Sequence, residues 1–180
     1  LGKYFYNQKD IERATEEFEK VNRDMLQVNY QDEYNFKYGY CLLQNGEIEK
    51  AKSYFIQVLN HESKYASPAK YYYAHVLYEE ANFVPALQYF NELKEDKTFA
   101  GIAPFYIAQI YFLQKRYDEL AELTPQIIDG APPKRRTEIT HMTGQILYDR
   151  EMYTEALPYL QEAIENNELA TDIDLYELAY

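Results

Sequence analysis

Histidine, cysteine and carboxylate side chains are the groups in this sequence that could do chemistry, and their spacing assembles no catalytic or metal site. The three histidines, His61, His75 and His141, stand far apart in the chain. The single cysteine, Cys41, excludes an internal disulfide and a cysteine-based zinc site. No HExxH motif, glycine-rich phosphate loop or Gly-x-Ser-x-Gly motif occurs. We therefore predict a protein that is not an enzyme and that holds no metal ion or cofactor.

Aromatic residues form the other candidate site. Residues 69–90 read AKYYYAHVLYEEANFVPALQYF, and aromatic residues make up 17% of the chain. Tyrosine combines a broad apolar surface with a polar tip and loses little entropy on binding, so it is enriched at interfaces. The stretch is either a binding surface or the interior of a helical fold. The elements that carry it decide between the two.

The amino-acid composition limits the possible fold classes and binding partners. The net charge is −12, and nucleic-acid affinity rests on lysine and arginine, whose only cluster here is the short run 134–136. No apolar run approaches the roughly 18–20 residues of a membrane span. With 6 glycines and 7 prolines, the chain also lacks the many turn residues of an all-β fold. We predict a single helical domain that neither binds nucleic acid nor spans a membrane.

An internal repeat runs through the whole chain. Four of the five copies place an alanine four positions before a large apolar residue, and the fourth copy has Leu120 and Thr124 instead. Twelve positions before this alanine or leucine stands a small residue in every copy, as in Gly39, Ala51 and Phe55. Spacings of three and four are typical of the apolar stripe of a helix. Each unit is therefore two amphipathic helices whose backbones approach closely at the small residues. The five aligned segments are DIERATEEFEKV (10–21), EIEKAKSYFIQV (47–58), NFVPALQYFNEL (82–93), RYDELAELTPQI (116–127) and MYTEALPYLQEA (152–163).

This pattern resembles the tetratricopeptide repeat, a unit of about 34 residues. The resemblance implies an all-α fold, a right-handed superhelical solenoid of antiparallel helix pairs. Both ends of the sequence read as cut, which indicates a segment of a longer array. The expected division is a partial repeat at 1–31, repeats at 32–66, 67–100, 101–136 (irregular) and 137–171, and the start of a sixth repeat at 172–180.

Two local expectations concern helix ends. Ser67 and Pro68 have the residue types of an N-cap followed by the first helical position. In the irregular fourth repeat, Pro125 falls within the second helix, where it removes an amide donor. We expect that helix to be kinked or broken.

The resemblance also implies a concave groove lined by the first helix of each pair. Aromatic residues recur at the groove positions, so we predict a peptide-binding groove there. The lysine and asparagine of the family's dicarboxylate clamp are absent. His75 and His141 are two repeats apart, roughly 20 Å at a helix spacing of about 10 Å, too far to share a metal ion. The predicted groove residues are Phe36, Tyr40, Tyr71, His75, Tyr78, Phe105, Gln109, Phe112, His141 and Tyr148.

The resulting functional hypothesis is a non-enzymatic protein–protein interaction scaffold. The expected partner is a protein or peptide with apolar or proline side chains, and exposed repeat ends favour self-association. Two alternatives stay open: a ligand-sensing input domain of a larger regulatory protein, and a glycan-binding module in which tyrosines stack on sugars. Tyrosine-rich arrays of this kind resemble bacterial envelope-associated scaffolds, which favours the periplasm or cell envelope over the cytoplasm.

Overall fold

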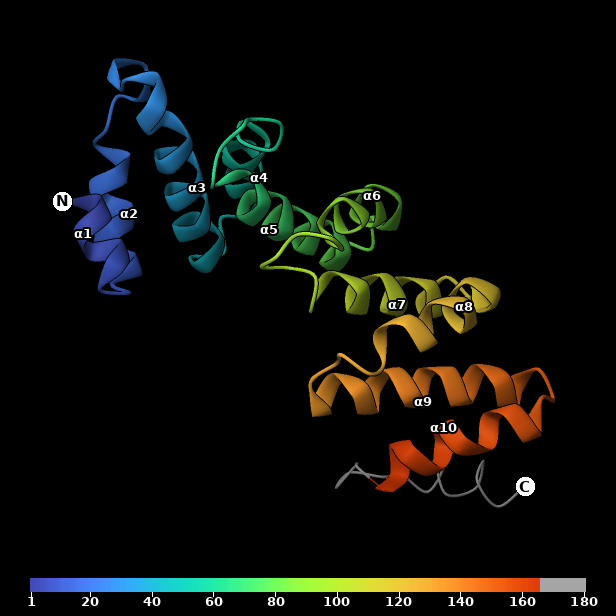
Figure 1. Cartoon of the computed structure of the whole chain (residues 1–180). Coiled ribbons are helices and arrows are strands. Elements are labelled where there is room, and N and C mark those ends of the chain that lie inside the picture. The colour runs from blue at the N-terminus through green and yellow to red at the C-terminus, as the bar shows by residue number, and fades with distance from the viewer. Residues whose placement is uncertain (166–180) are drawn as a thin grey trace. The chain divides into compact units, whose positions relative to one another are not determined.

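Residues 1–165 are described by the computed structural model, and they contain ten α-helices, one short 3-10 helix and no strand. The helices follow one another as five helix–turn–helix pairs (Figure 1). The predicted all-α fold of helix pairs is confirmed. The predicted start of a sixth repeat, 172–180, lies outside the described residues. The chain forms two compact units, Leu1–Phe99 and Ala100–Tyr180, and each is described by itself.

The first unit holds three pairs. The first helix of each pair packs against the first helix of the next, because α1 contacts α3 and α3 contacts α5. The second helix of one pair also contacts the first helix of the following pair. The helices are α1 (Gly2–Asn7), α2 (Ile11–Glu19), the 3-10 helix η1 (Arg23–Met25), α3 (Val28–Gln44), α4 (Ile48–Ile56), α5 (Ala66–Glu79) and α6 (Phe83–Leu93).

The second unit holds two pairs within the described residues. Its helix α9 contacts both helices of the preceding pair and packs along α10. The helices are α7 (Ala103–Leu113), α8 (Tyr117–Ile127), α9 (Pro133–Asp149) and α10 (Tyr153–Glu165).

The repeating small residues lie where the two helices of a pair touch. A methyl group added to Gly39 would stand 3.0 Å from the ring of Phe55, and one added to Gly144 would stand 2.7 Å from the Leu160 side chain. Such distances leave no room for a larger residue. The two repeat positions of the second helix, which hold alanine and a large residue in all pairs but the fourth, are buried in every pair. These are Ala14, Ala51, Ala86, Leu120 and Ala156, followed by Phe18, Phe55, Phe90, Thr124 and Leu160.

The turn inside each pair has one geometry in all five copies. A residue with positive φ follows the first helix; its amide donates to the carbonyl three residues back, and the next amide donates to the carbonyl five residues back. This is the Schellman motif, which usually takes glycine at the left-handed position. Here only one of the five is glycine. The left-handed residues are Lys9, Gly46, Ala81, Lys115 and Glu151.

Of the kink or break expected in the second helix of the fourth pair, the break does not occur, because α8 continues through Pro125 to Ile127. The amide of Ile128 still donates to the carbonyl of Thr124 at 3.0 Å, so the proline removes a donor only near the end of the helix. Thr124 takes the place of the usual large apolar residue. Its buried hydroxyl bonds to the Leu120 carbonyl at 2.9 Å and to the Thr143 hydroxyl at 2.8 Å.

The predicted N-cap at Ser67 was also wrong. Helix α5 begins at Ala66, with Tyr65 as its N-cap, so it starts two residues earlier than predicted. The Tyr65 ring stacks on Phe36 with ring centroids 5.6 Å apart, and its amide donates to the Ser63 hydroxyl at 3.2 Å. Aromatic packing therefore sets the start of this helix, and Pro68 lies in the first turn, where amides have no helical partner.

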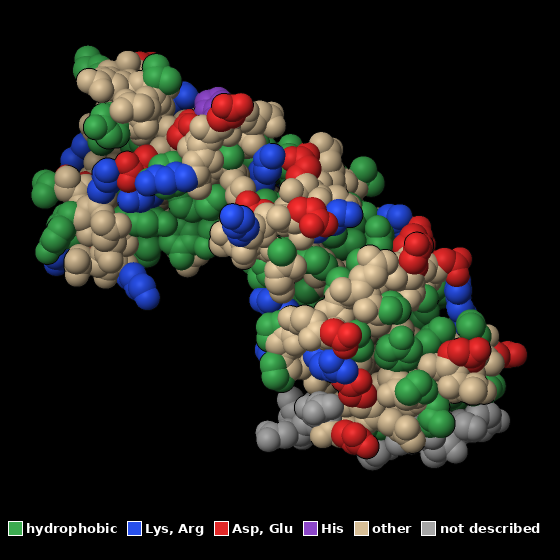
Figure 2. Space-filling model, in the orientation of Figure 1, with side chains coloured by type: hydrophobic (Ala, Val, Ile, Leu, Met, Phe, Trp, Pro, Cys, Tyr) green, Lys and Arg blue, Asp and Glu red, His purple; other side chains and the backbone are tan. Residues whose placement is uncertain are grey.

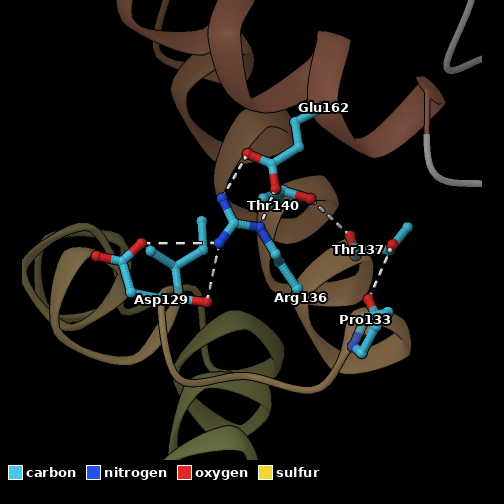
Figure 3. A network of polar contacts seen from close by, with 7 residues as sticks. Asp129, Pro133, Arg136, Thr137, Thr140 and Glu162 are labelled. Carbon is cyan, nitrogen blue, oxygen red and sulfur yellow. Dashed lines mark hydrogen bonds and ion pairs between the residues drawn. The ribbon is translucent and has the colours of Figure 1, made fainter.

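Arg136 joins three segments of the second unit (Figure 3). From α9 its guanidinium binds the Glu162 carboxylate of α10 with two nitrogens. It also donates to the Ile128 carbonyl at 3.3 Å and lies 3.7 Å from the Asp129 carboxylate. Planar guanidinium groups suit such bidentate contacts. The contacts tie the loop after α8 to the last helix pair.

Candidate binding groove

A cavity of about 490 Å³ lies in the first unit where α3, α4 and α5 meet. Its volume falls within the range of pockets that bind small ligands or side chains. The last turn of α3 and the start of α4 form one wall, and α5 with its C-cap residue forms the other. The lining residues are Leu43, Gln44, Ile48, Glu49, Tyr71, Tyr72, His75, Val76, Glu79 and Glu80.

The helical register of α5 explains how one element supplies most of the wall. Residues four apart lie on the same helix face. Tyr71, His75 and Glu79 therefore form one row, and Tyr72, Val76 and Glu80 form the adjacent row. Each row begins with a tyrosine and ends with a carboxylate. The cavity is thus aromatic at one end and acidic at the other.

A row of aromatic rings crosses the first helices of the unit and reaches the cavity. Tyr6 of α1 meets Tyr40 of α3 edge to face at 5.7 Å, and Tyr40 meets Tyr72 of α5 at 5.1 Å. Tyr72 meets Tyr71 at 5.2 Å, and Tyr71 stacks on Phe99 at 4.9 Å. Edge-to-face and stacked pairs at these distances are favourable. The result is a continuous aromatic surface.

Two hydroxyl groups of this row, those of Tyr6 and Tyr72, have raised pKa values. Burial raises the pKa of Tyr6 and of Tyr72 to about 12, and the neighbouring Tyr40 adds to both shifts. Protonated phenols donate hydrogen bonds. Such a surface combines apolar area with polar hydroxyl tips.

Carboxylates surround the acidic end of the cavity. Glu80 accepts from Lys52 through both oxygens, at 3.0 and 2.9 Å, and Glu49 accepts from the same lysine at 3.2 Å. Glu79 lies 3.8 Å from the Nε2 atom of His75. Lys52 pairs with two of the three lining carboxylates, Glu49 and Glu80, so carboxylates outnumber the lysine at this end of the cavity.

A second polar cluster lies nearer the start of α3. The carboxylate of Glu33 binds Lys3 at 2.7 Å and Lys37 at 2.9 Å, and it accepts from the Tyr65 hydroxyl. Burial raises the pKa of Glu33, but these hydrogen bonds outweigh it and hold the pKa at about 2. Lys37 also lies 4.9 Å from the Tyr6 ring centroid. The cluster fixes α1 against α3 beside the aromatic row.

The predicted groove residues of the first unit have different surroundings. Tyr71 and His75 line the cavity, and Tyr40 belongs to the aromatic row. Tyr78 is half-buried, and its ring centroid lies 6.5 Å from that of His75. Phe36 is only 7% exposed and packs in the hydrophobic cluster of the unit. Figure 2 shows hydrophobic side chains gathered over α3, with charged side chains of both signs beside them.

The other five predicted residues belong to the second unit, where all are partly buried. The Arg135 guanidinium lies 5.6 Å from the Phe105 ring centroid and donates to the Gly101 carbonyl at 2.9 Å. Tyr148 meets Tyr153 at 5.3 Å. Phe105 and Gln109 lie on α7 with Phe112, and His141 and Tyr148 lie on α9.

Sequence reasoning missed two aromatic residues. Tyr72 connects Tyr40 to Tyr71, and Phe99 stacks on Tyr71 from the segment after α6. Tyr72 directly follows a predicted groove position and lies four residues before Val76, so the helix period was a signal for it. Phe99 lies outside the aligned helices, and the repeat pattern gives no signal for its position.

Two findings concern other functional classes. In residues 1–165, no three or more histidine, cysteine, aspartate or glutamate side chains gather in a group that could hold a metal ion. His61 lies instead 2.7 Å from Asp32, on the surface. Within the same residues, none of the helices is both long enough and apolar enough to cross a membrane.

Comparisons with known proteins agree with the repeat pattern. A family model described as tetratricopeptide repeat matches residues 32–62. A solved structure, the C-terminal part of a TPR repeat-containing protein from Cytophaga hutchinsonii, resembles the chain with a TM-score of 0.67 and 16% sequence identity. The match covers 99% of this chain and 67% of that chain. At this identity the likeness shows the fold alone. No curated protein matches the chain.

Proposed function

We propose that this chain, which contains a tetratricopeptide repeat at 32–62 and has the fold of such repeats, binds a peptide segment of a partner protein along the aromatic surface of α3 and α5. Tetratricopeptide repeats indicate a protein–protein interaction scaffold. Within that function we propose a non-enzymatic scaffold that holds a peptide on the aromatic surface of the first unit. In the second unit, taken by itself, the proposed peptide contacts are the predicted residues Phe105, Gln109, Phe112, His141 and Tyr148.

The observation that supports the proposal most is the aromatic row that leads to a cavity. Tyr40, Tyr71 and Tyr72 offer apolar surface with hydroxyl tips, and the cavity beside them has room for a side chain. Central aromatic residues in such pockets dominate interface energies. A peptide with apolar or proline side chains fits this surface, and its carbonyl groups can accept from the tyrosine hydroxyls.

A photocrosslinking experiment tests which face binds. A benzophenone amino acid replaces Gln44, which lines the cavity, in one variant, and Val84, which is 78% exposed on α6, in the other. We expect a crosslinked partner from position 44 and none from position 84. Efficient crosslinking to the same partner from position 84 alone would place the interface on the second helices and overturn the proposal.

The crosslinked segment, made as a synthetic peptide, then provides a quantitative test. Calorimetric titration should show that Tyr71→Ala together with Phe105→Ala removes several kcal/mol of binding, because central aromatic anchors contribute about 2–4 kcal/mol each. Circular dichroism must show unchanged helicity in the double variant. Unchanged affinity with an intact fold would contradict the groove.

We also propose that two exposed apolar side chains near the start of α3 support self-association. Met25 and Val28 are 83% and 82% exposed. Exposed apolar patches promote association. Sedimentation velocity of Met25→Ser together with Val28→Ser should show less oligomer than the unchanged chain. The same fraction of oligomer in both proteins would show that these two side chains do not form the contact. The periplasm or cell envelope as the compartment stays a prediction from the sequence.

A further inference from the structure

We infer that the cavity between α3, α4 and α5 binds one arginine side chain of the partner peptide. This inference rests on the proposed function and names the residue type that the groove selects. It follows from three features of the cavity: its excess of carboxylates, its tyrosine rings and its apolar walls.

The carboxylates determine the charge of the occupant. Glu49, Glu79 and Glu80 all line the cavity, and Lys52 pairs with two of them. The Glu79 side chain is 63% exposed and lies at the mouth, 3.8 Å from His75. An acidic side chain would be repelled here. An apolar side chain would remove water from the carboxylates without replacing its hydrogen bonds, which is costly.

The tyrosines favour a planar cation. The rings of Tyr71 and Tyr72 line the cavity, and their centroids lie 5.2 Å apart at an angle of 74°. A guanidinium group is attracted to the face of a tyrosine and stacks on it. The same group binds a carboxylate with two nitrogens, which the compact ammonium of lysine does not do. Arginine therefore uses both the aromatic and the acidic ends of the cavity.

The apolar wall accommodates the rest of the side chain. Leu43, Ile48 and Val76 line the cavity beside the tyrosines. Arginine buries its methylene stem on apolar surface while its charged head stays at polar groups. A volume of about 490 Å³ has room for the stem, the head and part of the flanking peptide backbone.

Two matched peptides test this inference on the full chain. The probes are the acetylated, amidated peptides Leu-Pro-Arg-Pro-Leu and Leu-Pro-citrulline-Pro-Leu, in which citrulline keeps the shape of arginine without its charge. Titration followed by amide NMR should shift the signals of Tyr71, Tyr72 and His75 with the arginine peptide. We expect an affinity about tenfold lower for the citrulline peptide.

Three variants locate the effect. Glu79→Gln should weaken binding of the arginine peptide about fivefold to tenfold and leave the citrulline peptide unchanged. Tyr71→Leu, which keeps the apolar bulk but removes the aromatic face, should also lower the preference for arginine. The control is Glu95→Gln, an exposed carboxylate that does not line the cavity, and it should behave as the unchanged chain.

Each contrary outcome overturns the inference without deciding the proposed function. Equal affinity for the two peptides, together with NMR signal shifts of cavity residues, would show that the groove binds a peptide without recognising its positive charge. An equal loss in Glu79→Gln and Glu95→Gln would assign the effect to the net charge of the chain. The absence of shifts at millimolar peptide would exclude a side-chain site in this cavity. The crosslinking from position 44 would still test the groove independently.

Discussion

At the scale of single residues, Asn35 lies in the interior of the first unit without a polar partner. It is 0% exposed, and neither polar atom of its side chain has a hydrogen-bond partner among the described residues. Unsatisfied buried polar groups cost about 1–3 kcal/mol. Asn35→Leu keeps the branched shape and should raise the free energy of unfolding in urea by about 1–2 kcal/mol.

The matched control for this prediction is Asn29→Leu on the same helix. Asn29 is exposed, so this variant changes only the helix propensity, an effect of a few tenths of a kcal/mol. A lower stability of Asn35→Leu than of the unchanged chain would mean that the amide contributes a hydrogen bond to the folded state.

Glu33 gives a prediction about pH. Its pKa in the folded chain is about 2, below its ordinary value of 4.5, because the bonds from Lys3, Lys37 and Tyr65 outweigh burial. A lowered pKa stabilises the fold above the ordinary value, and this contribution is lost as the pH falls towards 2. Glu33→Gln should therefore lower the unfolding free energy by about 1–3 kcal/mol at pH 7.

The measurement is urea unfolding of both proteins at pH 7, 5, 4 and 3. The difference between them should be constant from pH 7 to 5 and should shrink at lower pH. The exposed carboxylate Glu12 provides a control, since Glu12→Gln should change stability little at any of these values. A difference between Glu33→Gln and the unchanged chain that does not depend on pH would contradict the ion-pair account.

At the scale of elements, the residue with positive φ in the turn of each helix pair gives a prediction about backbone strain. A non-glycine residue in the left-handed region lowers stability by about 1–2 kcal/mol. Glycine avoids this strain, but its unfolded chain has more conformational freedom, and this offsets part of the gain. Ala81→Gly should therefore stabilise the chain by about 0.5–1 kcal/mol, and Gly46→Ala should destabilise it by about 1 kcal/mol. Thermal unfolding measures both.

The control for the turns is Gly130→Ala. Gly130 has no positive φ, and an added methyl group would meet no described atom within 4 Å. This variant should be neutral or slightly stabilising. Equal destabilisation by the two glycine variants would contradict the role of the left-handed turn.

The contact between the helices of a pair gives a second prediction at this scale. Phe55 is fully buried against Gly39, whereas Ile56, the next residue of α4, is 51% exposed. Phe55→Ala should cost about 3–5 kcal/mol through the cavity it leaves, and Ala51→Leu about 1–3 kcal/mol through overpacking. Ile56→Ala should cost under about 1 kcal/mol. Similar unfolding midpoints for Phe55→Ala and Ile56→Ala would show that the register is wrong.

The sequence predicted the elements better than their ends. Helix pairs and their buried faces could be read because small and large residues recur with a period, and packing requires both at the contact, as Gly39 and Phe55 show. Helix ends depend on single contacts that do not recur. Tyr65 stacks on Phe36 and starts α5 before Ser67, and the shared turn was hidden because most copies lack the glycine that signals it.

The candidate site could be predicted only in part, for a similar reason. Family positions indicate which helix face is available, and Tyr71 and His75 do line the cavity. They do not indicate how far each side chain is covered by its neighbours, and Phe36 is buried by the ring of Tyr65. The charge of the cavity arises from α4 and α5 together, so no single segment revealed it.

At the scale of the whole molecule, each compact unit contains hydrophobic clusters of its own, around Phe55 and Tyr38 in the first and around Ile139 and Leu160 in the second. In repeat proteins stability is approximately a sum of units and their neighbour contacts. A fragment of residues 1–99 contains the complete cavity and should fold alone. It should unfold cooperatively by circular dichroism and bind the crosslinked segment from the groove, though more weakly than the full chain if the second unit contributes.

A shorter fragment, 1–95, sharpens this last prediction, because it lacks Phe99, which stacks on Tyr71, and Asp96, which bonds to Ser67. Losing one stacked aromatic pair and one hydrogen bond should cost about 1–3 kcal/mol of stability relative to 1–99. The amide signals of Tyr71 and His75 should shift between the two fragments, because the wall of the cavity loses its support. A fragment 1–99 that is unfolded would show that the first unit needs the rest of the chain to form its groove. Two fragments with identical stability would contradict the contribution of Phe99 and Asp96.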